Sequence, residues 1–486
     1  MGPRRCSAGG TTGARRRRAG AVLALVVAVA TVAVEGSAVA GAANAGKGRS
    51  HGSAGPLVNW TTYHGNSLET GVAPGSYNFQ HAKEAWTSPA LDGQLYGEPL
   101  VDGGLVVVAT ENDVVYALSA SSGAVVWSTT VGTPVPDSAL PCGDIDPNVG
   151  ITSTPVIDTG RAEVFVVADE TDGVTISHHL VGLALGTGSV ELDQVVDPAG
   201  TTTEAQLQRP ALALDEGRVL VGFGGNAGDC STYHGWLVSV PEAGGAALDF
   251  EVDPTPGNDE GAIWMGGAAP VVDGNGDIWL ATGNGSNTSG ASPDLSDSVV
   301  ELSPALGVLQ TFTPSTWQSD NASDADLGSS VPVVTGNGLV LQVGKSQTAY
   351  LLSASRLGGV NGQVAEKGVS SRCASDVDGG SAFTSTATSS VVYMPCLAGV
   401  MAVKVTTKHS VRVLWRTNTG ARGPAIMVGN LVWSINPDGT LVGLHKGNGR
   451  QAAAFSIGAP ANHFPTPSVG DGLLLAPSAD QVVAFR

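Results

Sequence analysis

The sequence is poor in charged and aromatic side chains, which make up 14% and 5% of its 486 residues. It also lacks the short motifs of several enzyme classes: there is no nucleophile elbow, P-loop, dinucleotide fingerprint or His-Glu-x-x-His pair. Neither Cys-x-x-Cys nor two adjacent cysteines occur, so zinc ribbons and thioredoxin-like redox chemistry have no support. These absences leave hydrolytic and nucleotide-dependent functions without positive evidence.

Several of the few basic residues lie in a leading segment of distinct composition. Arg15 to Arg18 precede an uncharged apolar run over residues 19–34, and Ala43-Asn44-Ala45 offers a small-residue cleavage site. This order is typical of a secretory signal, which we predict for residues 1–45. The apolar run is long for a signal and short for a membrane span, so an uncleaved anchor is the alternative.

Positive charge is scarce in the rest of the chain. Removing residues 1–45 changes the balance from 24 basic and 43 acidic residues to 18 and 42, a net charge of −24. Such a chain repels the phosphate backbone, which excludes nucleic acid as a partner. We expect a secreted or cell-envelope monomer that meets a membrane only through an uncleaved N-terminal segment.

Cysteine is rare as well, and four cysteines remain after the signal: Cys142, Cys230, Cys373 and Cys396. An even number in an exported chain predicts two disulfides. Cys373 and Cys396 flank one strand-and-turn unit and are the easier pair to propose. The bond Cys142–Cys230 then follows.

Glycine and proline, by contrast, are abundant, with 67 and 27 residues, and this predicts many short elements joined by turns. The clearest unit spans residues 97–127. It contains a strand with a proline, a β-branched run, a second apolar run after the turn at Asn112-Asp113, and an outer strand that follows Gly123 and ends at Trp127.

The same order of strands recurs along the chain. Further middle strands are predicted at residues 164–168, 218–223, 277–282, 338–343, 391–395, 431–435 and 473–476. Third strands are centred on Leu118, Leu183, Val240, Leu302, Leu352, Val403, Leu444 and Phe485, which follow one another at 41 to 65 residues. The sequence therefore predicts an all-β, eight-bladed β-propeller over residues 57–486, after a flexible linker at 46–56. Two tandem β-sandwiches are the alternative.

The last unit ends at Arg486 without an outer strand. The segment 84–91 precedes the first complete unit and resembles an outer strand, with Trp86 placed like Trp127. Pairing it with the last unit would close the ring and remove an exposed edge. Two sandwiches would not need such a leftover strand, so the propeller is favoured.

The repeat resembles that of the quinoprotein-like propellers, relatives of the pyrroloquinoline quinone (PQQ) dehydrogenases. Residues Ala117 to Trp127 follow the family's Ala-x-Asp-x-x-Thr-Gly-x-x-x-Trp frame, with Ser119 in place of the Asp. Weaker copies have the glycine at Gly188, Gly245, Gly307 and Gly449, and the opening Trp60-Thr-Thr-Tyr-His-Gly is similar to the start of many of these propellers. The resemblance implies an eight-bladed fold. It does not fix the activity, because the family includes enzymes and assembly scaffolds.

In the family's dehydrogenases, PQQ lies on a tryptophan and beside a calcium ion, and an aspartate acts as the base. By resemblance, Trp264 and Trp236 are candidates for cofactor binding, Asp229 and Asn284 for calcium, and Asp326 for the catalytic base. The usual cover of two adjacent cysteines is missing, and so is an attached haem motif.

Each candidate also has a structural interpretation. The two tryptophans could pack between blades, Asn284 could serve its Gly-Asn-Gly turn, and Asp326 could cap a loop. The segment 273–277, Asp-Gly-Asn-Gly-Asp, has the alternating oxygens of a calcium loop, but a hairpin turn is the favoured interpretation because the distant Glu is missing.

We therefore expect a non-catalytic or cryptic PQQ-repeat-like propeller that binds a small ligand or a protein outside the cytoplasm. A calcium- and PQQ-dependent alcohol or polyol dehydrogenase is the first alternative, because Trp264, Asn284 and Asp326 recur together in order. A scaffold for envelope protein assembly is the second, and it rests on the family resemblance alone.

Overall fold

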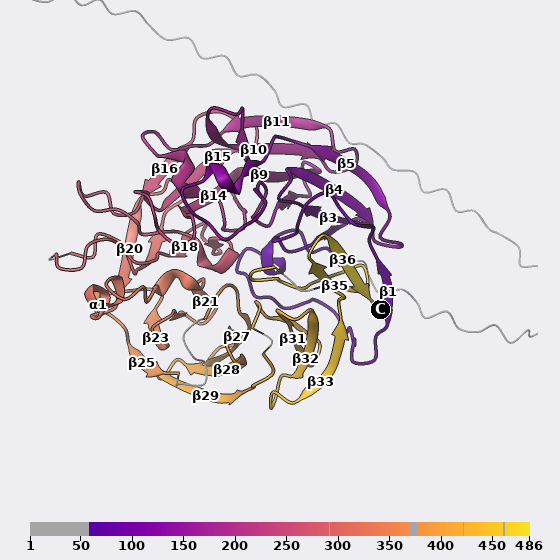
Figure 1. Ribbon diagram of the computed structural model, residues 1–486. Coiled ribbons are helices and arrows are strands. Elements are labelled where there is room, and N and C mark those ends of the chain that lie inside the picture. Colours follow the sequence, from indigo (N-terminus) through magenta and orange to yellow (C-terminus); the bar gives the residue numbers. More distant parts are fainter. Residues whose placement is uncertain (1–57, 291, 370–376, 421, 460–461) are drawn as a thin grey trace, which may run out of the picture. The chain divides into compact units, whose positions relative to one another are not determined.

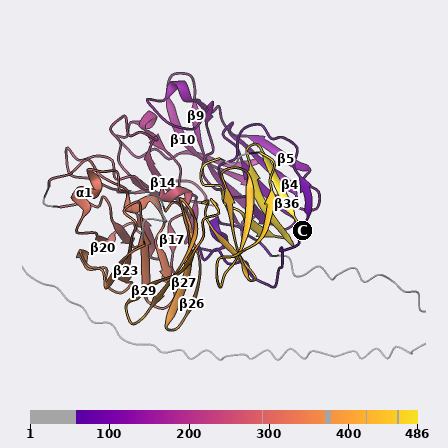
Figure 2. The ribbon, with the colours of Figure 1, turned by 60° about the horizontal axis from the view of Figure 1, so that its bottom comes forward.

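The computed structural model describes residues 58–290, 292–369, 377–420, 422–459 and 462–486, and these form eight small antiparallel sheets around one axis (Figures 1 and 2). We number the sheets as blades 1 to 8 in chain order. The innermost strand of each blade faces the axis, and the outermost strands lie at the periphery. The all-β, eight-bladed propeller predicted from the sequence is confirmed.

The first four blades contain the long insertions. From the axis outwards, blade 1 consists of β2 (Leu100–Asp102), β3 (Leu105–Ala109), β4 (Val114–Ser119) and β5 (Val125–Thr130). Blade 2 consists of β8 (Val156–Asp158), β9 (Glu163–Thr171), β10 (Ile176–Ala184) and β11 (Val190–Val195). In blade 3, β12 (Gln206–Leu207) and β13 (Ala213–Asp215) both pair with β14 (Arg218–Gly225), followed by β15 (Trp236–Pro241) and β16 (Leu248–Glu251). Blade 4 has β17 (Val271–Val272), β18 (Ile278–Ala281), β19 (Val299–Leu302) and β20 (Val308–Thr313), with β24 (Gly359–Val360) added in parallel.

The last four blades are more regular. Blade 5 has β21 (Val333–Thr335), β22 (Leu339–Val343), β23 (Thr348–Ser353) and β25 (Ala365–Gly368), and blade 6 has β26 (Ala382–Thr386), β27 (Ser389–Cys396), β28 (Gly399–Thr406) and β29 (Ser410–Arg416). Blade 7 has β30 (Ile426–Val428), β31 (Leu431–Asn436), β32 (Thr440–His445) and β33 (Gln451–Ser456). Blade 8 has β34 (Ser468–Gly470), β35 (Leu473–Ser478), β36 (Gln481–Phe485) and β1 (Glu84–Thr87).

Short elements decorate the connections. They are the pair β6 (Val135–Pro136) and β7 (Asn148–Val149), the single-turn helices η1 (Tyr63–Gly65), η2 (Asp137–Ala139), η3 (Thr203–Ala205), η4 (Met265–Gly267) and η5 (Leu327–Ser329), and α1 (Trp317–Asn321). None of the helices in the described part of the chain is long and apolar enough to cross a membrane. The predicted signal at 1–45 and the linker at 46–56 lie outside the described residues, as does Cys373, so the predicted bond Cys373–Cys396 stays a prediction.

The ring is closed by strand β1, which pairs antiparallel with β36 of the last blade (Figure 1). Trp86 lies opposite Ala484, and Lys83 and Arg486 exchange two backbone hydrogen bonds of 2.9 Å. The predicted three-plus-one closure is therefore confirmed. Because β1 completes the last sheet, β36 does not present an open edge there.

Neighbouring blades are joined by tryptophans that lie on glycines. The indole Nε1 of Trp86 donates to the carbonyl of Ala120 at 2.9 Å, and its ring covers Gly123 of blade 1. The indole of Trp127 likewise donates to the carbonyl of Leu185, and its ring covers Gly188. The indole of Trp415 donates to the carbonyl of Lys446, and its ring covers Gly449. These glycines have φ of 69° to 72°, and a Cβ at any of them would come within 2.5 Å of a ring carbon. Glycine therefore serves both the turn and the aromatic contact.

A segment that we call the plug, residues 58–73, crosses the axis and hydrogen-bonds to the inner part of six blades. Trp60 exchanges two bonds of 2.8 Å with Val101 of blade 1. Further backbone bonds join the plug to Ile157, Val272, Phe383, Met427 and Asp471, in blades 2, 4, 6 and 7 and at the first turn of blade 8. The side chains of Tyr63 and His64 are buried and stacked at 4.4 Å. The plug thus ties both halves of the ring together.

We expect the replacement Trp86→Ala to lower the free energy of unfolding by about 3 kcal/mol, because it removes a buried indole and its inter-blade bond. Val126→Ala on exposed strand β5 is the matched control and should change stability by less than about 0.5 kcal/mol. Urea unfolding followed by fluorescence measures both. Equal effects of the two changes would contradict a closing role for Trp86.

The contact between Trp86 and Gly123 can be tested by a double-mutant cycle. Gly123→Ala should destabilise the wild type, since the new Cβ meets the indole ring at 2.5 Å and strains a positive φ. In the Trp86→Ala background the steric part of this loss disappears, so the two effects should be non-additive by about 1 kcal/mol. Additive effects would show that the two residues do not interact.

Candidate functional site

A cavity of about 660 Å³ opens at the end of the channel where the inner strands begin. Its wall is built from two kinds of loop. Residues ahead of the inner strands contribute Tyr96, Arg209, Trp264, Asp326, Asp378 and Phe464, and loops between second and third strands contribute Asp229, Tyr233, Asn284 and Lys345. The plug contacts the inner strands farther along, so it closes the channel beneath this cavity.

Four of the residues singled out in the sequence meet in this cavity. Asp229, Trp264, Asn284 and Asp326 come from separate loops of blades 3 to 5 and all contribute to its wall. Trp236 is not among the residues that line it. It lies in β15, pairs with Phe223 and Glu251 of the neighbouring strands, and packs against the core of blades 2 and 3. The packing interpretation therefore describes the position of Trp236.

Asp326 is the most tightly held of the four. The residue is 3% exposed, its Oδ1 accepts a hydrogen bond from the backbone N–H of Asn284 at 2.7 Å, and its Oδ2 lies 2.6 Å from the ammonium of Lys345. Burial raises the pKa of Asp326, and Lys345 opposes that rise. Lys345 also binds Asp324 at 2.8 Å. Burial opposes its charge, but the two carboxylates outweigh burial and raise the pKa of the ammonium. The ammonium of Lys345 therefore joins the buried Asp326 to Asp324.

The ring of Trp264 lies in the cavity wall beside Lys345 and Phe464. The Nζ of Lys345 lies 5.5 Å from the centre of the indole ring, within cation–π range. The ring of Phe464 is tilted by 38° to that of Trp264, with centres 6.4 Å apart. Gly283 packs against Asp326, because a Cβ at this glycine would come 2.7 Å from Asp326 Oδ1. The aromatic and charged parts of the wall are therefore in direct contact.

Arg209 is a cation that the sequence analysis did not single out. It is 7% exposed, and no carboxylate in the described part of the chain comes within 4.0 Å of its guanidinium. Its partners are the carbonyl of His463, at 3.2 Å, and the ring of Phe464, at 5.7 Å. Burial lowers its pKa, and the carboxylate of Glu111 opposes that effect. A buried guanidinium with neutral partners is prepared to receive an anion.

The side chain of Asn284 is tied to an acidic neighbour. Its amide donates to Glu260 at 3.1 Å, and burial, reinforced by the carboxylate of Asp229, raises the pKa of Glu260 to about 7. Asp229 itself accepts a bond of 2.8 Å from the hydroxyl of Tyr233. Glu260 was not predicted, because the family resemblance pointed to Trp264 and Asn284 and not to the residues just ahead of them.

These contacts bear on whether calcium fits the cavity. Both oxygens of Asp326 already have partners, and among the described residues no three acidic, His or Cys ligand atoms of the cavity lie within 4.8 Å of one another. We assign no chemical step to a metal in the cavity. The roles of Asp229 and Asn284 as calcium ligands stay a prediction.

The cavity wall combines two cations and an aromatic surface with several carboxylates. Arg209 and Lys345 supply positive charge, Trp264 supplies an aromatic surface, and about 660 Å³ is in the range of small-molecule sites. PQQ, which is planar and carries three carboxylates, has this chemistry. The roles of Trp264 and Trp236 in holding it stay predictions.

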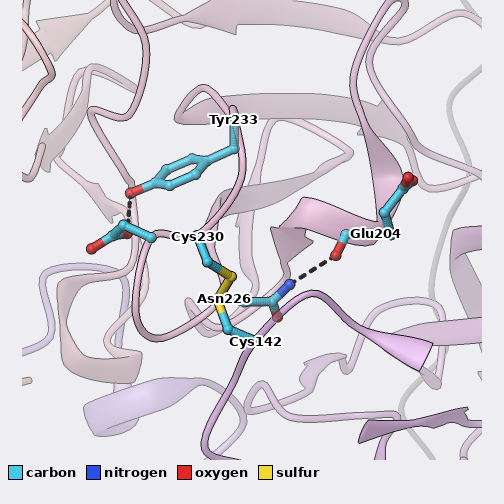
Figure 3. The surroundings of a disulfide bond; sticks show 6 residues. Cys142, Glu204, Asn226, Cys230 and Tyr233 are labelled. Atoms are coloured by element: carbon cyan, nitrogen blue, oxygen red, sulfur yellow. Dashed lines mark hydrogen bonds between the residues drawn. A yellow bond between two sulfur atoms is a disulfide. The ribbon is translucent and has the colours of Figure 1, made fainter. Parts of the chain in front are cut away.

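The rim of the cavity is fixed by a disulfide (Figure 3). Cys142, from the insertion between blades 1 and 2, is bonded to Cys230 in the loop of blade 3 that also carries Asp229 and Tyr233. Asn226 of the same loop donates to the carbonyl of Glu204 at 3.0 Å. The predicted Cys142–Cys230 bond is confirmed, and it anchors the loop that forms this part of the wall.

Comparisons with known proteins agree with the fold. Residues 76–295 match the family model described as outer membrane protein assembly factor BamB. No curated protein matches. Among solved structures, the quinohemoprotein alcohol dehydrogenase of Comamonas testosteroni is 16% identical, with a TM-score of 0.66 over 89% of this chain and 81% of that one. The alcohol dehydrogenase ADHIIG of Pseudomonas putida HK5 is 14% identical, with a TM-score of 0.64 over 88% and 80%.

A protein named as in the matching family model is also among the similar structures. BamB of Moraxella catarrhalis is 15% identical, with a TM-score of 0.51 over 83% of this chain and 97% of that chain. At such identities the structures establish the fold alone. The sequence match over residues 76–295 and the closed ring of eight blades agree with the resemblance to the quinoprotein-like, PQQ-repeat β-propellers.

Proposed function

We propose that this propeller is a binding module that acts outside the cytoplasm and holds a flat, anionic small molecule in its axial cavity. The observation that carries the proposal is the buried guanidinium of Arg209, which lines the cavity and has neutral partners. Burying a guanidinium without a carboxylate in ion-pair contact is costly, and an anionic ligand would offset that cost with charge-assisted hydrogen bonds.

The rest of the wall suits the same ligand. The indole of Trp264 and the ring of Phe464 offer aromatic surface, and Lys345 adds a second cation across the cavity. PQQ is one candidate with this chemistry, and when bound it would supply a two-electron quinone. In that case Arg209 and Lys345 would hold its carboxylates and Trp264 its ring. The remaining acidic wall, including Asp229 and Asp378, would select against ligands with more negative charge.

Several features support a location outside the cytoplasm. The leader-like order of residues 1–45, the disulfide Cys142–Cys230 and the acidic surface are all common in exported chains. A role in envelope protein assembly, as in the name of the matching family model, would use the rim insertions instead of the cavity.

A quinone-dependent dehydrogenase is the second candidate, and the position of Asp326 at the cavity favours it. A buried carboxylate beside the ligand could accept a proton from a substrate hydroxyl. The ammonium of Lys345, at 2.6 Å, stabilises the carboxylate and makes it a weaker base. Binding without turnover is therefore the function that we favour.

The binding proposal predicts that the mature protein takes up PQQ, used as the probe, with a dissociation constant in the micromolar range. Arg209→Gln should weaken this binding by at least about tenfold, because a charge-assisted hydrogen bond contributes about 1.5 to 3 kcal/mol. Arg412→Gln, on the exposed outer strand β29, is the matched control and should have no effect. Isothermal titration calorimetry measures the dissociation constant of PQQ for the wild type and for both variants. Equal affinity of wild type and Arg209→Gln would refute the assignment of the anion to Arg209.

The dehydrogenase candidate is tested by dye reduction with PQQ and calcium over a panel of alcohols and polyols. We expect no turnover above that of PQQ without protein. Turnover that disappears in Asp326→Asn, while PQQ binding persists, would replace the binding module by the dehydrogenase. Calorimetric titration of Asp326→Asn with PQQ shows whether a loss of turnover in this variant comes from lost binding or from lost chemistry.

A further inference from the structure

The turn between β17 and β18 of blade 4 carries two carboxylates, in the segment Asp273-Gly-Asn-Gly-Asp277. The segment has the alternating oxygens of a calcium loop, but the sequence favours a hairpin because the distant Glu is missing. The hairpin is present: the N–H of Asp273 donates to the carbonyl of Asp277 at 3.0 Å, and Asp273 Oδ1 accepts the N–H of Asn275 at 2.8 Å. The structure also brings a further carboxylate to this turn.

Glu301 supplies that carboxylate from strand β19. It lies opposite Trp279 of β18 in the antiparallel register. Side chains alternate along a strand, and residues that lie opposite each other on paired strands point to the same face, so Asp277, Trp279 and Glu301 share one face of the sheet. One oxygen each of Asp273, Asp277 and Glu301 lie within 4.8 Å of one another. Three carboxylates therefore meet at one place.

Each of these carboxylates can accept a further ligand. The side chain of Asp277 makes no hydrogen bond with a described residue, and Glu301 accepts a bond only at Oε2, from Gln310. Asp273 accepts two N–H groups of the turn and the indole N–H of Trp279. A carboxylate has about four acceptor sites, so these three bonds orient Asp273 and leave it able to bind a cation.

A fourth carboxylate faces the same turn from blade 3. Asp215, in the turn between β13 and β14, is 6% exposed, and its side chain has neither a hydrogen bond nor an ion pair with a described residue. A Cβ at Gly276 would come 3.5 Å from Asp215 Oδ1 and 3.7 Å from Glu216 Oε1, so both carboxylates lie against the turn. A buried carboxylate without a partner, aimed at other carboxylates, is unfavourable unless a cation offsets the charge.

Basic side chains do not balance this group. Among the described residues, no nitrogen of Lys, Arg or His lies within 4.0 Å of the carboxylates of Asp215, Asp273, Asp277 or Glu301. Burial, followed by the charges of Glu216 and Asp277, raises the pKa of Asp215, and burial and the charge of Asp273 raise that of Asp277. The negative charges thus act mainly on one another.

We propose that Asp273, Asp277 and Glu301 bind a calcium ion at the end of the propeller opposite the ligand cavity, and that Asp215 faces this ion from blade 3. Calcium binds oxygens at about 2.3 to 2.6 Å and so touches two that lie up to about 5 Å apart, whereas magnesium, at about 2.1 Å, reaches only about 4 Å. Residues 274 and 275 of the turn are exposed, so water has access to the remaining positions of the ion. The ion would join the turns of blades 3 and 4.

The test is a calcium titration of the mature protein after removal of metals with EDTA. Calcium at about one hundred times its dissociation constant should raise the Tm by about 3 °C. Asp277→Asn should abolish this shift. In EDTA it should be at least as stable as the wild type, because it removes a repelling charge and no hydrogen bond. Asp158→Asn is the matched control, since Asp158 caps the equivalent turn of blade 2, and it should keep the shift.

Three outcomes would overturn the proposal. They are no calcium shift in the wild type, a shift that survives in Asp277→Asn, and a shift that is lost in Asp229→Asn instead, which would place the ion in the cavity. If Asp277→Asn does not fold, Glu301→Gln carries the test. It should weaken calcium binding by at least about tenfold in calorimetry, and an unchanged dissociation constant would overturn the site.

Discussion

The whole structure depends on the closure of the ring by strand β1. A propeller has no core that a single blade could bury alone, so each blade is stable because it packs against two neighbours. Blade 8 would lack its outer strand without residues 84–87, and Trp86 carries the contact from that blade to Gly123 of blade 1. The plug reinforces the closure from inside by bonding to six blades. Closure is therefore a long-range interaction between the two ends of the described chain.

The cavity is a consequence of this closure. Its wall begins at Tyr96 and ends at Phe464, and the residues between them come from most of the ring. Arg209 of blade 3 meets Phe464 ahead of blade 8, and Trp264 of blade 4 meets Lys345 of blade 5. A loss of register in any blade would separate the cations from the aromatic surface. The disulfide Cys142–Cys230 stabilises a loop of this wall, since long loops are costly to order.

Much of the fold could be predicted because its signals are local. Runs of β-branched residues followed by glycine turns mark the strands, and the missing outer strand after Phe485 pointed to Trp86. Trp264, Asn284 and Asp326 were found through a family resemblance. Arg209, Lys345 and Glu260 were not, because their neighbours in the sequence form no pattern and their role arises from contacts with other blades. The plug was missed for a related reason. Its bonds go to six different blades, and its own sequence shows neither the alternation of a strand nor the periodicity of a helix.

The most direct test of the account is native-state hydrogen exchange of strands β1 and β35, measured by mass spectrometry on the mature protein. If β1 closes the ring, its amides should open together with those of β35, with protection factors that agree within about tenfold. Both should approach the value for global unfolding. Fast exchange of β1 beside a fully protected β35 would show that the strand frays on its own, and it would contradict the closed ring on which the cavity depends.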